Sequence, residues 1–155
     1  MGFLGLHEAL LPILIAASLL VLPSTLATDI KYCDNSDYAV KVKDVDISPN
    51  PVVSGKVAKF RIAASTEEAI TGGNLKIGVS YYGVPIHSEN HDLCKETSCP
   101  VTSGDFVLSH EQTLPGFTPP GPYTLKMRLY AKDGSQLTCI TFDFKIKRGS
   151  TLSDS

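Results

Sequence analysis

The sequence contains no tryptophan, no N-x-S/T glycosylation sequon, no G-x-S-x-G motif and no cluster of basic residues. Hydrolases of the G-x-S-x-G type carry their serine on that turn, and Ser80, in GVSYYG, is one residue off the spacing. Lysines and arginines are spread along the chain, nearly all of them singly, so no face of the chain is expected to bind nucleic acid. These absences predict that the protein is neither an enzyme nor a nucleic-acid-binding protein.

The first 27 residues are expected to be a signal peptide. The apolar run from Ala9 to Leu22 is shorter than the roughly 20 residues that a transmembrane helix needs, and it has the length of a signal-peptide core. The small residues Thr25 and Ala27 then stand three positions and one position before a cleavage site. We therefore expect residues 1–27 to be removed and the protein to enter the secretory pathway, bound for the extracellular space or the lumen of a vacuole or lysosome.

The four cysteines, Cys33, Cys94, Cys99 and Cys139, indicate two disulfides, because an exported chain with an even number of cysteines normally oxidises them. Three pairings are compatible with this number. Cys94 and Cys99 flank a short polar turn, so a local bridge is the simplest choice, and it leaves Cys33 to pair with Cys139. On a chain-entropy estimate the long loop stabilises the fold by about 4.7 kcal/mol and the short one by about 2 kcal/mol.

Alternating apolar and polar residues dominate the chain after residue 37, and no helical stripe is present. The strand at 38–47 is expected to contain a bulge at Asp44, where the alternation slips. Asp133-Gly134 is a strong hairpin signal. Strands are expected over 38–47, 56–65, 75–82, 84–86 (a short piece at a sheet edge or a bend), 106–112, 123–130 and 137–146, with surface loops over 87–102 and 114–122 and a disordered tail over 148–155. This spacing predicts an all-β fold, a two-sheet antiparallel sandwich with an immunoglobulin-like topology, in one domain over residues 28–147.

The densest polar segment could be drawn as a zinc site made of His87, Glu89, His91, Asp92, Cys94 and Cys99. Zinc needs thiolates, whereas an exported chain is expected to oxidise these two cysteines and leave surface imidazoles that bind nothing. His110 could act as a general base, but a surface or hydrogen-bonded histidine is the commoner case. We therefore expect no metal, no cofactor and no catalytic residue.

Several motifs taken together resemble the ML lipid-recognition family, which includes Niemann–Pick type sterol carriers and phosphatidylglycerol/phosphatidylinositol transfer proteins. The resemblance covers roughly residues 32–147. Its landmarks are Cys33, ISPNP at 47–51, YYGVPI at 81–86, C-x4-C-P at 94–100, TPPGPYTLKMRL at 118–129 and DGSQLTCITFDFKI at 133–146. The sterol carriers have a further cysteine pair at the ISPNP position, where this chain has Asn50.

The resemblance implies a sandwich whose sheets are splayed around a lipid cavity. Periodicity alone cannot distinguish a cavity from a filled core, and the close packing of ordinary protein interiors would favour the filled core. It also implies the pairing of Cys33 with Cys139 and of Cys94 with Cys99. Phe117, Pro119 and Pro120 are expected to form part of a rim that touches membranes, with an ordinary connecting loop as the alternative. The side chains expected to contact lipid are Phe60, Ile62, Ile77, Val79, Tyr81, Phe106, Leu108, Phe117, Leu125, Met127, Leu129, Phe142 and Phe144.

The function implied is that of a monomeric lipid-binding and transfer protein that holds a sterol or a phospholipid, touches membranes transiently and delivers its cargo to an acceptor. The alternative is a lipid-sensing accessory subunit that presents its ligand to a receptor.

Overall fold

The computed structural model describes residues 28–149, so the predicted signal peptide and most of the predicted tail lie outside the described residues. Its elements are β1 (Ile30–Tyr32), β2 (Val40–Ser48), β3 (Val52–Val53), β4 (Val57–Thr66), β5 (Gly73–Tyr81), β6 (Val84–Asp92), α2 (Leu93–Glu96), β7 (Gly104–Thr113), β8 (Gly121–Ala131) and β9 (Gln136–Lys147). Within residues 28–149 no helix has the length and apolar character needed to cross a membrane.

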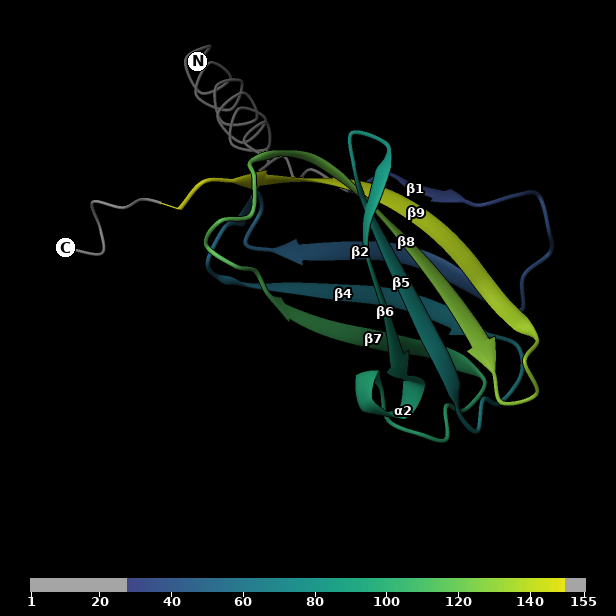
Figure 1. The fold of residues 1–155 in the computed structure, drawn as a ribbon. Coiled ribbons are helices and arrows are strands. Elements are labelled where there is room, and N and C mark those ends of the chain that lie inside the picture. The colour runs from purple at the N-terminus through teal and green to yellow at the C-terminus, as the bar shows by residue number, and fades with distance from the viewer. Residues whose placement is uncertain (1–27, 150–155) are drawn as a thin grey trace, which may run out of the picture.

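The strands form two layers (Figure 1), as the alternating pattern predicts. The larger sheet has the order β1-β9-β8-β5-β6, with β3 pairing with β9 in parallel, and the smaller sheet has the order β2-β4-β7. Apart from β3, every described pairing within the two sheets is antiparallel. The predicted bulge is confirmed, because the register of β2 against β4 shifts between Val42 and Asp44.

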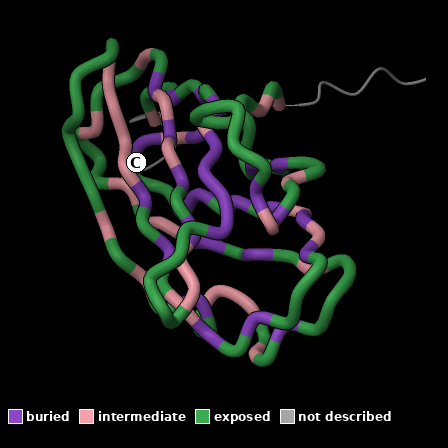
Figure 2. Tube along the Cα trace, turned by 90° about the vertical axis from the view of Figure 1, so that its right-hand side faces the viewer, coloured by how far each residue is buried: buried purple, intermediate pink, exposed green. Residues whose placement is uncertain are grey.

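The apolar faces of the two sheets meet to form the core, which lies along the centre of the sandwich in Figure 2. The core is tightly filled toward the turn between β8 and β9, where Leu75, Met127, Leu129 and Ile140 are fully buried. The turn itself contains Gly134 with a φ of +88°, a left-handed conformation that favours glycine and fits the Asp-Gly signal.

Both predicted disulfides are confirmed. The Cα atoms of Cys33 and Cys139 are 5.4 Å apart, and those of Cys94 and Cys99 are 5.3 Å apart. Cys33 follows β1, a short strand that the sequence pattern did not predict, so the long bridge joins the end of β1 to β9. Two disulfides are typical of proteins that fold in an oxidising compartment.

The predicted surface loop over 87–102 is wrong in its first third. The strand that was expected to stop at Ile86 continues as β6 to Asp92, at the edge of the larger sheet, and α2 follows directly. Side chains still alternate between the two faces of the strand, with Glu89 and His91 half-buried, but polar residues occupy both faces. A pattern without apolar residues resembles a loop, which is why the prediction failed there.

Candidate functional site

A cavity of about 400 Å³, called here the inter-sheet cavity, lies between the two sheets at the end away from the turn between β8 and β9. Its apolar walls come from β4, β5, β8 and β9, and the segment 114–119 covers one end. Ile86 and Phe117 line the cavity and are also exposed, so they mark its mouth. This volume lies within the range of pockets that bury a drug-sized ligand, roughly 300–1,000 Å³.

The inter-sheet cavity brings together six of the thirteen side chains that were expected to contact lipid, namely Phe60, Ile77, Val79, Phe117, Leu125 and Phe144. The other seven lie outside its lining, namely Ile62, Tyr81, Phe106, Leu108, Met127, Leu129 and Phe142. Ile62, Leu108, Met127 and Leu129 are buried in the filled part of the core. Lipid contact by any of the thirteen stays a prediction.

Tyr81 does not line the cavity. Its phenol contacts the proline-rich segment between β7 and β8. Its hydroxyl donates to the carbonyl of Pro120 at 2.9 Å, and the hydroxyl of Tyr123 donates to the carbonyl of Pro119 at 2.7 Å. Burial, followed by the neighbouring Tyr81, raises the pKa of Tyr123. The segment is therefore anchored at its base, while the side chain of Phe117 at its tip remains 87% exposed.

A histidine–glutamate cluster, defined as His87, Glu89, His91, Glu96 and His110, lies beside the cavity. In the sheet register, Glu89 pairs with Ile77 and His110 pairs with Phe60, so both polar residues share a face with an inward apolar neighbour. The cluster joins the edge strands of the two sheets, β6 and β7, through α2. His87, Glu89 and His110 also line the inter-sheet cavity.

Glu89 is the centre of this cluster. Its carboxylate lies 3.1 Å from Nε2 of His87 and 3.2 Å from Nε2 of His91. With its amide nitrogen turned toward Glu89, Gln112 donates to both carboxylate oxygens at 2.9 and 3.0 Å. Burial raises the pKa of Glu89, but the hydrogen bonds from His87 and His91 outweigh that effect and hold the pKa below its ordinary value.

The zinc site that could be drawn from the sequence does not form as drawn. Cys94 and Cys99 are bonded to each other, and the carboxylate of Asp92 accepts a hydrogen bond from the backbone N–H of Cys94 at the start of α2. His110, expected to be a surface or hydrogen-bonded histidine, is buried and hydrogen-bonded to Glu96. The link between β6 and β7 depends on tertiary packing, and only the spacing of His87, Glu89 and His91 at every second residue could have indicated it.

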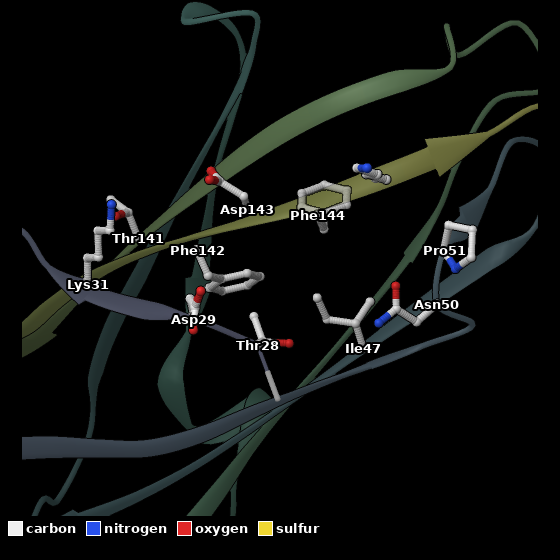
Figure 3. A pocket seen from close by; sticks show the side chains of 11 residues that line it. Thr28, Asp29, Lys31, Ile47, Asn50, Pro51, Thr141, Phe142, Asp143 and Phe144 are labelled. Atoms are coloured by element: carbon white, nitrogen blue, oxygen red, sulfur yellow. The ribbon is translucent and has the colours of Figure 1, made fainter. Parts of the chain in front are cut away.

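A second cleft, of about 500 Å³, lies beside β1 and β9 (Figure 3). Phe142 and Phe144 of β9 and Ile47 of β2 form its apolar part. Apart from Pro51, its remaining lining is polar or charged and includes Asp29 and Lys31. The inter-sheet cavity is the better site for an apolar ligand because its walls are mainly hydrophobic.

Several known proteins are similar to this chain in sequence. The chain is 32% identical over 118 residues to a phosphatidylglycerol/phosphatidylinositol transfer protein of Aspergillus oryzae, covering 72% of this chain and 67% of the relative. It is 36% identical over 118 residues to the MD-2-related lipid-recognition protein ROSY1 of Arabidopsis thaliana, covering 73% and 69%.

Solved structures resemble the fold at low sequence identity. A Niemann-Pick type C2 protein from the Japanese carpenter ant matches with a TM-score of 0.62 at 16% identity, over 77% of this chain and 99% of that one. Chicken MD-1, complexed with lipid IVa, matches with a TM-score of 0.52 at 23% identity, over 79% and 93%. The sequence profile of the ML domain matches residues 27–146. The chain therefore belongs to the ML domain family.

Proposed function

We propose that this protein binds a single lipid, a sterol or a phospholipid, in the inter-sheet cavity and transfers it between membranes. The observation that carries the proposal is an apolar cavity between the sheets of an ML domain whose relatives include phosphatidylglycerol/phosphatidylinositol transfer proteins. Burying apolar ligand surface contributes roughly 25 cal/mol per Å² without any directional contact. The shape of the cavity would then select the ligand.

The mouth of the cavity supports direct contact with a membrane during transfer. Phe117 projects from the anchored segment between β7 and β8, and Val84 and Ile86 are exposed on β6. Ile86 and Phe117 both border the opening, so a bilayer that touches them would lie next to the cavity. Apolar side chains exposed together in this way mark an interaction surface.

A tryptophan placed in the cavity tests the proposal. Val79 on β5 and Leu125 on β8 are paired in the sheet register, and both line the cavity. Val79→Trp or Leu125→Trp should fill the cavity and abolish the uptake of a fluorescent sterol and of labelled phosphatidylglycerol and phosphatidylinositol, measured separately. Arg128→Trp, at an exposed position of β8, is the matched control and should bind as the unmodified protein does.

Circular dichroism must show that all three variants keep the fold. Unchanged uptake in both cavity variants would refute this location of the lipid, and absence of uptake by the unmodified protein would refute lipid binding altogether. Movement of the probe from donor to acceptor liposomes distinguishes a transfer protein from an accessory subunit that retains its ligand for a receptor. The proposed place of action is the secretory pathway, either outside the cell or in the lumen of a vacuole or lysosome.

A further inference from the structure

We propose that Glu89, His91 and His110 form a zinc-binding site beside the mouth of the inter-sheet cavity. The donor atoms of these three side chains all lie within 4.8 Å of one another. They come from two strands that belong to different sheets, because β6 is an edge strand of the larger sheet and β7 of the smaller one. The proposal does not depend on the lipid, because zinc alone is the probe.

The spacing of the donor atoms suits a tetrahedral zinc ion. Oε2 of Glu89 lies 3.2 Å from Nε2 of His91 and 3.6 Å from Nε2 of His110. Zinc bonds of about 2.0–2.1 Å place neighbouring tetrahedral ligands roughly 3.3 Å apart. The two distances bracket that value, so Oε2 of Glu89 is placed to share an ion with each imidazole, and torsion changes of the two histidines within the 4.8 Å group would bring both nitrogens onto one ion.

Glu96 is placed to orient the imidazole of His110 through a hydrogen bond, and it lies near that of His91. Its Oε1 lies 3.1 Å from Nδ1 of His110 and 3.6 Å from Nδ1 of His91. An Nδ1–H that donates to a carboxylate leaves the Nε2 lone pair free for a metal, and zinc-bound histidines are commonly held in this way. The arrangement sets the same nitrogen of both rings toward Glu89.

Burial and charge favour an ion at this position. The side chain of His110 is only 7% exposed and that of Glu96 only 11% exposed. The carboxylates of Glu89 and Glu96 both face the imidazoles of His91 and His110, and a divalent cation held by those rings and Glu89 would be attracted to both negative charges. Water or Nε2 of His87, which lies 3.1 Å from the other oxygen of Glu89, would supply the fourth ligand.

The decisive experiment is calorimetric titration of ZnCl2 into the purified full chain after EDTA treatment. We expect one zinc ion per chain, and a visible spectrum typical of tetrahedral coordination when Co²⁺ replaces zinc. Glu89→Gln and His91→Gln should each abolish saturable binding. Glu96→Gln removes the orienting carboxylate and should weaken the affinity about 10–100-fold.

The control is Glu111→Gln, at an exposed carboxylate on β7 that neighbours His110 in sequence. It should leave zinc affinity and stoichiometry unchanged, and circular dichroism should show that each variant is folded. The proposal is overturned if the unmodified chain binds no zinc. It is equally overturned if Glu89→Gln and His91→Gln, both folded, bind zinc as tightly as the Glu111→Gln protein does, which would indicate adventitious surface binding.

Discussion

Thr138 presents a hydroxyl that is buried without a hydrogen-bond partner among residues 28–149. Leaving a polar group unsatisfied in the interior costs roughly 1–3 kcal/mol. Thr138→Val replaces the hydroxyl with a methyl group of similar size, so we expect the free energy of unfolding to rise by about 1 kcal/mol. Urea denaturation measures this as a higher midpoint with an unchanged slope.

Thr124→Val provides the contrast, because the hydroxyl of Thr124 donates to the carboxylate of Asp143 at 2.6 Å. That substitution should not raise the free energy of unfolding. A lower midpoint for Thr138→Val would mean that its hydroxyl has a partner, such as a bound water, in solution.

For single residues, the sequence predicted which side chains point inward but not which of them line a cavity. The alternation in β5 and β8 correctly set Val79 and Leu125 inward. It could not show that Leu129, on the same face of β8 as Leu125, is fully buried while Leu125 lines a cavity. Filled and hollow parts of a sandwich have the same periodicity, so the difference depends on how far apart the sheets lie.

At the scale of elements, the segment between β7 and β8 is the part most suited to membrane contact. The hydroxyls of Tyr81 and Tyr123 donate to two of its carbonyls, and the hydroxyl of Ser54 donates to the carbonyl of Thr118 at 2.8 Å. These hydrogen bonds order the segment in the absence of a membrane. An ordered apolar tip loses little conformational entropy on binding. Phe117→Ser should therefore slow liposome-to-liposome lipid transfer several-fold. Because Phe117 also lines the cavity, the slowing should exceed any loss of lipid affinity, which is measured separately in detergent.

Val107→Ser is the matched control for this prediction, since Val107 is an exposed apolar residue on β7 that does not line the cavity. Equal slowing by both substitutions would mean that general surface hydrophobicity, and not the tip of the segment, governs transfer.

The strand β6 shows where prediction from sequence ends for elements. Proline is tolerated at sheet edges, so the sequence placed residues 84–86 at a sheet edge or a bend, and β6 is an edge strand. The continuation to Asp92 depends on pairing with β5, which no local pattern reveals. The polar inward face of β6 contacts Glu96 of α2 and, from farther along the chain, His110 and Gln112 of β7.

At the scale of the whole molecule, the sequence predicted the two-sheet sandwich and both disulfides. Seven of the nine strands within residues 28–149 correspond to predicted segments, and only the short β1 and β3 were missed. Two or three residues are too few for alternation to be visible, and β3 pairs in parallel with a strand far away in sequence. Such pairings are a property of the assembled fold.

The two disulfides should differ in their contribution to global stability. Cys33–Cys139 spans 106 residues and Cys94–Cys99 spans 5, so the first constrains the unfolded chain far more. We expect the double variant Cys33→Ala/Cys139→Ala to lose up to about 4.7 kcal/mol of unfolding free energy, and Cys94→Ala/Cys99→Ala about 2 kcal/mol. Urea midpoints measured at one pH give the comparison. Because Cys139 is buried, its truncation also removes packed atoms; the protein reduced with dithiothreitol retains every sulfur atom and gives the combined loss of both bridges for comparison with the two double variants. If the two double variants lose equal stability, local packing and not loop entropy determines what each bridge contributes.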